Sequence, residues 1–462
     1  MNYPTARPAR SGADPATLTA SEGAALVRSG QLRPSDWMRA CLDRAMAIEP
    51  RVHAWAFLDA ELALGYARVA DAVDWSQWKP APHLAGVPLG IKDIFNTIDM
   101  PTAMGSDLWT GFTPHNDARP VSHAKWAGAV PMGKTATAEF AVHAAGKTAN
   151  PWSKGRIAGT SSTGSAVAVA CGAVPVAFGT QSAGSIVRPA SYVGTIGYKP
   201  SFGLVARTGV LKTCDTLDTI GWFGRSVADV RLMLDAVAQR GRDYPVTERR
   251  IGAATAKRER NRGRPWRIAL CKAPGWETAS RHTQDRVVEL VNQIDNRPDV
   301  DVVELDLRQV FADAHDTHAT VYHKSLHYYF QKELAQSDKV SDIFRRITEE
   351  GARVTREQYV AATRRQRAME DELERLTADV DVLVTHATAG EAPTIEAPEE
   401  PRDSALVWTM IGAPSISLPL LTGPAGLPLG LQLVAPRFGD YTLLDFAESL
   451  FPGSAPVIDP KD

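Results

Sequence analysis

The sequence lacks the charge excess, the long apolar runs and the cysteine clusters that mark several functional classes of protein. The formal net charge is −2, from 51 basic and 53 acidic residues that are well mixed, which gives no sign of a nucleic-acid or anionic-membrane partner. No apolar run approaches the ~20 residues of a membrane span, and the N-terminal segment lacks the apolar core of a signal peptide. Only four cysteines occur, far apart and without metal-ligand spacing, at Cys41, Cys171, Cys214 and Cys271. These absences predict a soluble protein in a reducing, cytoplasmic setting.

One stretch is unusually rich in small residues. From Gly159 to Pro200 the chain reads GTSSTGSAVAVACGAVPVAFGTQSAGSIVRPASYVGTIGYKP, with serines and glycines where a packed core needs bulk. Small side chains let backbone N–H groups approach a ligand, and a serine at a tight turn can present its hydroxyl beside them. The stretch therefore predicts a site for nucleophilic chemistry, whereas a plain Ser/Gly-rich loop is the structural alternative.

Three motifs in order resemble those of the amidase signature family, whose members hydrolyse carboxamides with a Ser-cisSer-Lys triad. They are GVPLGIKD (Gly86 to Asp93), GTSSTGS (Gly159 to Ser165) and TQSAGSIVR (Thr180 to Arg188). Weaker similarities run from LTASE near the start to GLPLGLQL near the end, so that the resemblance covers nearly the whole chain.

The resemblance assigns the nucleophile to Ser185, the bridging serine to Ser161 and the general base to Lys92. A serine hydroxyl needs a neighbour to take its proton, and lysine can do this only when it is neutral. Burial disfavours the ammonium form, so the apolar run from Leu84 to Ile91 is a suitable setting for such a lysine.

The resemblance also implies an oxyanion hole formed by the backbone N–H groups of Ser182, Ala183, Gly184 and Ser185. The chain departs from the family pattern nearby, because threonines replace two glycines, Gln181 replaces an aspartate and Ala183 replaces a glycine. Backbone donors tolerate such changes, and the three catalytic positions are unaltered.

Arg188 follows the nucleophile at the third position, as in the malonamidase-like branch of the family, instead of the second. An arginine fork can bind a carboxylate through two hydrogen bonds, which predicts a substrate that carries an acid group. The alternative is that Arg188 pairs with an internal acid and braces the turn that carries Ser185. Both interpretations stay open at this point.

Further substrate contacts are expected from two segments. The family's helical region here contains Tyr322 and His323, and His386 stands where the family segment has a proline. The histidines His315, His318, His323 and His327 could in principle hold a metal, but the spacing lacks the glutamate of a zinc-protease helix. We therefore predict no metal and regard these histidines as lining the pocket or facing solvent.

Residues Gly128 to Thr135, GAVPMGKT, match the phosphate-loop pattern G-x4-GK-[ST] in full. A phosphate loop needs a preceding strand and an accessible backbone, whereas SHAKWA precedes this segment and its interior is apolar with a proline. A buried strand is the better interpretation, and a nucleotide-binding protein is the alternative from another class.

The chain alternates strand and helix patterns, which predicts an α/β/α sandwich around a large mixed sheet, as the resemblance also implies. Helices are expected from Leu18 to about Asp74, a polar surface passage from Arg240 to Arg267, and long helices at 310–378. We predict a flexible segment at 1–17 and one domain at 18–462, in which 310–378 is a helical insertion.

The expected function is hydrolysis of a small carboxamide through an acyl-enzyme on Ser185, with no cofactor. The alternative within the family is an amidotransferase A-type subunit that passes ammonia to a partner, although that motif ordinarily keeps the aspartate and the T-G-G-S lost here. The expected partner is a small-molecule amide, without nucleic acid or membrane, and a homodimer is one open assembly state.

Overall fold

The computed structural model describes residues 14–461 except 79–82, 143–145 and 242–243. Most of the flexible segment predicted at 1–17 lies outside the described residues, and Pro15–Thr17 forms a short 3-10 helix. The single domain predicted for 18–462 stays a prediction.

Within the described residues, eleven strands form one sheet in the order β1-β3-β2-β4-β6-β5-β10-β11-β9-β7-β8. The sheet is mixed, since β2 pairs in parallel with β3 and β4, whereas β4, β6, β5, β10, β11 and β9 pair antiparallel in turn. The strands are β1 (Trp55–Leu58), β2 (Pro88–Lys92), β3 (Val130–Thr135), β4 (Val176–Gln181), β5 (Ile196–Lys199), β6 (Thr219–Gly224), β7 (Trp266–Lys272), β8 (Val300–Asp306), β9 (Val382–His386), β10 (Ser415–Thr422) and β11 (Pro428–Val434).

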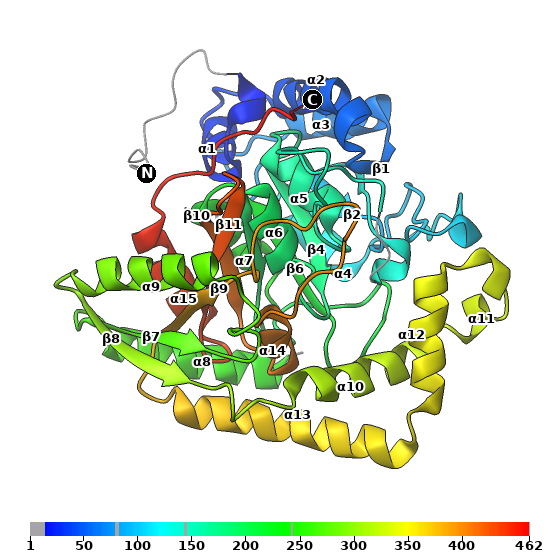
Figure 1. Cartoon of the computed structure of the whole chain (residues 1–462). Helices are drawn as coiled ribbons and strands as arrows, with labels where there is room; N and C mark the ends of the chain where they lie inside the picture. Colours follow the sequence, from blue (N-terminus) through cyan, green and yellow to red (C-terminus); the bar gives the residue numbers. More distant parts are fainter. Residues whose placement is uncertain (1–13, 79–82, 143–145, 242–243, 462) are drawn as a thin grey trace.

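Helices lie around this sheet, as Figure 1 shows, and complete the predicted α/β architecture with a large mixed sheet. Those described are α1 (Ala20–Arg28), α2 (Pro34–Val52), α3 (Ala60–Asp71), α4 (Arg119–Trp126), α5 (Thr163–Ala170), α6 (Val187–Val193), α7 (Val227–Val237), α8 (Pro245–Arg260), α9 (Arg281–Asp295), α10 (Ala314–Tyr329), α11 (Gln331–Leu334), α12 (Asp342–Arg353), α13 (Arg356–Leu376), α14 (Ala405–Met410) and α15 (Asp440–Leu450). None of the described helices is long and apolar enough to cross a membrane.

Two fully buried helices, α5 and α6, position the candidate site near the middle of the sheet. Every residue of α5 is buried, and this helix packs on β2, β4 and β6. Helix α6 is also buried throughout and packs on β10, β11 and α5. Because alanine, glycine and valine dominate α5, its backbone lies close to the strands that end at the site.

The predicted long helices form a separate layer at the lower edge of Figure 1, where α10 packs against both α12 and α13. Helix α10 also packs against α14, which follows the loop after β9. This layer brings residues after 310 back to the small-residue stretch.

One local prediction was wrong, and a second segment lies at the surface as expected but contains a helix that was not predicted. The helical segment expected from Leu18 to Asp74 is interrupted by β1, which pairs antiparallel with β3 at the edge of the sheet. The expected surface passage from Arg240 to Arg267 contains α8, since alanine, arginine, lysine and glutamate favour a helix and Pro245 occupies its first turn.

Candidate active site

Lys92 is the last residue of β2 and is fully buried. Its Nζ atom donates to three hydroxyls, at 2.6 Å to Ser161 Oγ, 2.9 Å to Ser162 Oγ and 2.9 Å to Thr180 Oγ1. Burial lowers the pKa of Lys92 well below its usual value, and the more distant charge of Asp218 opposes this only in part. A lysine with hydroxyl partners and a lowered pKa can accept a proton from one of them.

The segment that leads into α5 holds Ser161 and Ser162 against β4. Ser161 has a φ of 51°, a left-handed conformation that is uncommon for a residue with a side chain. Ser162 Oγ donates to the carbonyl oxygen of Thr180 at 3.1 Å. A Cβ atom at Gly164 would lie 2.4 Å from the backbone nitrogen of Ala136, so glycine is required for this close approach. These constraints place the hydroxyl of Ser161 at Lys92.

Ser185 lies in the turn between β4 and α6 and is 8% exposed. The side chain of Gln181 holds this turn, because its Oε1 accepts the backbone N–H groups of Ile186 at 2.8 Å and Val187 at 3.0 Å. Its Nε2 donates to Thr409 Oγ1 at 2.9 Å, which ties the turn to α14. Gln181, at a position where the family has an aspartate, therefore accepts hydrogen bonds from the two backbone amides at the start of α6.

The turn contains four consecutive backbone amides that precede Ile186. Among the described residues, no hydrogen bond engages the N–H groups of residues 182–185, the positions predicted for the oxyanion hole. Ala183 and Ser185 are nevertheless buried, and they follow a strand whose own amides are paired. Unpaired amides that converge on one turn can stabilise an oxyanion.

Asp218, which the sequence analysis did not select, holds the start of this turn. Its Oδ1 accepts from Ser182 Oγ at 2.6 Å, and its Oδ2 accepts the N–H groups of Thr213 at 2.7 Å and Cys214 at 2.9 Å. On the other side, Nε2 of His318 lies 2.8 Å from the carbonyl oxygen of Ser182. The first residue of the candidate oxyanion hole is thus fixed through both its side chain and its carbonyl group.

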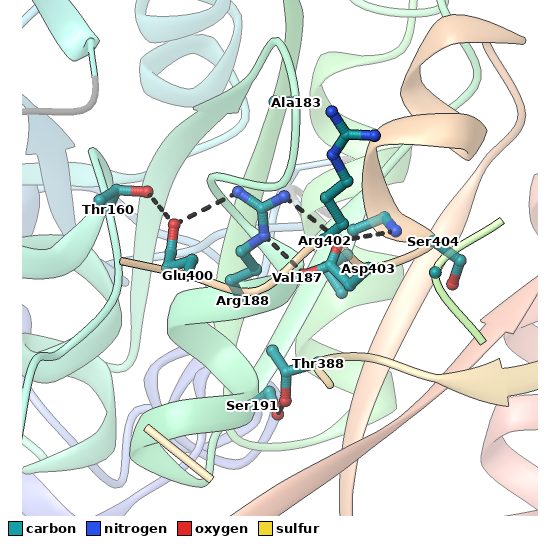
Figure 2. A network of polar contacts seen from close by, with 12 residues as sticks. Thr160, Ala183, Val187, Arg188, Ser191, Thr388, Glu400, Arg402, Asp403 and Ser404 are labelled. Atoms are coloured by element: carbon teal, nitrogen blue, oxygen red, sulfur yellow. Dashed lines mark hydrogen bonds and ion pairs between the residues drawn. The ribbon is translucent and has the colours of Figure 1, made fainter. Parts of the chain in front are cut away.

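Arg188 is buried between two carboxylates, as Figure 2 shows. Its Nε and Nη2 donate to Asp403 at 2.7 and 3.2 Å, and its Nη1 donates to Glu400 Oε2 at 3.3 Å. Although burial alone would lower it, the charges of Asp403 and Glu400 hold the pKa of Arg188 above its usual value. The guanidinium thus has internal acids as partners, which is the bracing arrangement. A role in binding a substrate carboxylate stays a prediction.

The other three residues that were predicted to contact the substrate lie in different parts of the structure. His386 ends β9, is fully buried beside the ring of Trp276, and burial lowers its pKa to about 4. Tyr322 is buried on α10, where burial raises its pKa and a hydrogen bond with Thr213 partly opposes that rise. The Nδ1 of His323 lies 3.1 Å from Glu350 Oε2 on α12. Tyr322 thus connects to the Asp218 network, whereas His323 contacts the outer helices.

The four histidines of α10 have separate partners. Nε2 of His315 lies 3.2 Å from the carbonyl oxygen of Asp403, and Nε2 of His327 lies near the side chain of Gln331. Across the described residues, no three His, Cys, Asp or Glu side chains are placed to share a metal ion.

The segment that matched the phosphate-loop pattern contains β3, whose residues are all buried, as predicted. Lys134 on this strand is enclosed by Asp93, the Pro101 carbonyl and Thr102, at 3.0, 2.9 and 2.6 Å. It therefore anchors the loop after Lys92 and is not available to a phosphate group. A cavity of about 1150 Å³ lies elsewhere, between α8, α13 and α15, and none of the candidate residues lines it.

The chain is similar in sequence and in fold to known proteins. The model of the family described as Amidase matches residues 36–444. The chain is 32% identical to the A-type subunit of the glutamyl-tRNA(Gln) amidotransferase of Streptomyces coelicolor, covering 92% of this chain and 93% of that protein. The structure is similar to that of the native peptide amidase of Stenotrophomonas maltophilia, with a TM-score of 0.80 and 27% identity over 96% of this chain and 99% of that chain. The fold also matches the A-type subunit of the glutamyl-tRNA(Gln) amidotransferase of Thermotoga maritima, with a TM-score of 0.75 and 22% identity over 97% and 99% of the two chains.

The matched hydrolase architecture and the buried lysine beside serines indicate an enzyme that acts on amide bonds. The chain belongs to the amidase family, and its activity is amide hydrolysis.

Proposed function

We propose that this chain hydrolyses a small carboxamide to a carboxylate and ammonia or an amine, through an acyl-enzyme on Ser185. The observation that carries the proposal is the 2.6 Å contact between Lys92 Nζ and Ser161 Oγ in a fully buried site. Neutral Lys92 accepts the proton of Ser161 while Ser161 accepts that of Ser185, and Ser185 Oγ bonds to the substrate carbonyl carbon.

The oxygen of the substrate carbonyl gains negative charge in this step, and the amides of residues 182–185 are the groups that would stabilise it. When the C–N bond breaks, the proton returns through Ser161 to the leaving nitrogen. Water then attacks the acyl carbon, its proton passes along the same route, and Ser185 leaves as the hydroxyl. Each proton taken up by Lys92 is released within the same half-reaction.

The second candidate is a subunit that passes ammonia to a partner. It is favoured by the 32% identity to an A-type amidotransferase subunit over 92% of this chain. Against it, Gln181 and Ala183 stand where that motif ordinarily has other residues. Turnover of simple amides by the isolated chain, with ammonia released to water, would favour the hydrolase over the ammonia-transferring role.

The decisive experiment is covalent labelling followed by a substrate panel. The purified protein is treated with a fluorophosphonate, the adduct is located by mass spectrometry, and primary and aryl amides are screened for ammonia or amine release. We expect the adduct on Ser185 and turnover of at least one amide. Labelling elsewhere, or no turnover of any amide, would contradict the proposal.

Several finer predictions belong to the same proposal. Tyr322, His323 and His386 are expected at the border of the substrate pocket, a homodimer is one assembly to test, and the cytoplasm is the expected location. Substitution of each side chain followed by a comparison of KM values tests the first of these points.

A further inference from the structure

The loop before α14 carries a carboxylate that points inward from an exposed segment. Residues 395–399 are exposed, as are Pro401 and Arg402 on the other side, whereas the side chain of Glu400 is only 7% exposed. A charged side chain enters a protein interior only where it finds partners. Burial of its side chain therefore distinguishes Glu400 from the exposed residues on either side of it.

Glu400 joins the two segments that carry the catalytic serines. Its Oε2 accepts from Thr160 Oγ1 at 2.8 Å, and Thr160 precedes Ser161 directly. The same oxygen accepts from Arg188, three residues after Ser185, at 3.3 Å (Figure 2). The guanidinium of Arg188 lies against the backbone of the candidate oxyanion hole, since a Cβ atom at Gly184 would be 2.6 Å from its Nε. Glu400 is thus held beside the reaction centre from two sides.

The second oxygen of this carboxylate is also buried. Glu400 Oε1 has no hydrogen-bond donor among the described residues, while both oxygens of Asp403 are engaged by Arg188. A buried acceptor without a donor is unfavourable, and a bound group that supplies an N–H would satisfy it. Burial, as the largest influence, also raises the pKa of Glu400, so a cation bound beside it would stabilise its charged form.

The charges of the cluster select the kind of ligand. One guanidinium faces two carboxylates, so the group of Arg188, Glu400 and Asp403 carries one net negative charge when all three are ionised. A substrate carboxylate would have to displace one of these internal acids from Arg188. A substrate ammonium group would instead donate to Glu400 Oε1, which accepts no hydrogen bond from the described residues, so no internal contact would have to be displaced.

We propose that Glu400 determines substrate specificity, binding through Oε1 an ammonium group that lies within a few bonds of the scissile carbonyl. The substrate class is then an amide that carries a protonated amine, such as an amino-acid amide. This inference rests on the proposed function, and it names the substrate class for the same site.

The test compares three amides on four proteins. The probes are alaninamide with an ammonium group, propionamide without a charge and malonamate with a carboxylate. The proteins are the unmodified chain, Glu400→Gln, Glu400→Ala and Glu399→Gln. Glu400→Gln keeps an acceptor for Thr160 and removes the charge, and Glu399→Gln removes a charge from the exposed neighbouring position.

We expect the unmodified chain to prefer alaninamide over propionamide in kcat/KM. Glu400→Gln should reduce that preference roughly 10- to 100-fold, as expected for loss of a charged hydrogen bond, while Glu399→Gln leaves it unchanged. Glu400→Ala should reduce it at least as far, and thermal unfolding of all variants checks that they remain folded.

An unchanged preference in both folded Glu400 variants would overturn the inference and leave the proposed function intact. A preference of the unmodified chain for malonamate would also overturn it, in favour of carboxylate binding at Arg188.

If none of the three probes is hydrolysed, fluorophosphonate labelling of Ser185 separates the two proposals. If alaninamide slows this labelling and propionamide at equal concentration does not, the inference is supported. Labelling that alaninamide does not slow overturns it, and absence of labelling contradicts the proposed function.

Discussion

Lys92 and Ser161 lie 69 positions apart in the sequence, yet Nζ of the lysine is 2.6 Å from Oγ of the serine, and both residues are buried. The strand β2 ends at the lysine, and the segment before α5 supplies the serine. This contact is the basis of the proposed proton transfer.

Replacing Ser185 with alanine should abolish hydrolysis and fluorophosphonate labelling without unfolding the protein. The turn is held by backbone and Gln181 contacts that do not involve the hydroxyl of Ser185, so its loss leaves these contacts in place. Activity, mass spectrometry and thermal unfolding measure the three effects. Ser29→Ala, at an exposed position, is the control. A Ser185→Ala protein that is still labelled would exclude Ser185 as the nucleophile.

Lys92→Met should reduce amide turnover by orders of magnitude, because methionine fills the space but cannot accept a proton. In the unmodified enzyme the neutral amine is the active form, so activity should rise with pH through the pKa of Lys92 and fall below it. Burial lowers this pKa, which places the rise at a lower pH than a solvent-exposed lysine would give. Rate measurements across pH test both points.

Lys134→Met is the matched control for Lys92→Met, since Lys134 is an equally buried lysine on the adjacent strand that contacts Asp93 in place of the serines. Its loss should lower stability but leave the pH at which activity rises unchanged. If the pH at which activity rises shifted in Lys134→Met, and the shift could not be traced to Lys92, a residue other than Lys92 would be the general base.

Asp218 positions Ser182, so Asp218→Asn should displace the first backbone amide of the candidate oxyanion hole. We expect catalysis to slow about 10- to 1,000-fold, by analogy with the loss of a single oxyanion donor. The charge of Asp218 raises the pKa of Lys92, so its removal should move the rise in activity to lower pH. Asp215→Asn, on the same loop but exposed, is the control and should change neither value. An unaltered pH profile together with an unaltered rate would exclude the positioning role of Asp218.

Arg188→Leu should destabilise the protein by about 3–5 kcal/mol, because it leaves Asp403 and Glu400 buried without their shared cation. Denaturant unfolding measures this change. If Arg188 acts as a brace, the ratio of kcat/KM between an acidic amide and its neutral isostere should stay the same. A loss of selectivity for the acidic amide with no change in stability would instead support the carboxylate-binding prediction.

The sequence by itself was sufficient for the family, the α/β fold with its mixed sheet and the candidates Lys92, Ser161 and Ser185. These features depend on local pattern: an apolar run ending at a lysine, small residues around serines, and strands alternating with helices. The buried strand β3 was also predictable, because its apolar pattern is a property of a few consecutive residues.

The tertiary structure alone decided what surrounds these candidates. Glu400 lies 240 positions from Thr160, and Asp403 lies 215 positions from Arg188. The loop that carries both acids has no periodicity that would distinguish Glu400 from its exposed neighbour Glu399. Which of the two enters the site depends on how α14 and α6 place the loop over the serines. Partners brought together by packing leave no local pattern, since only the folded chain makes them neighbours.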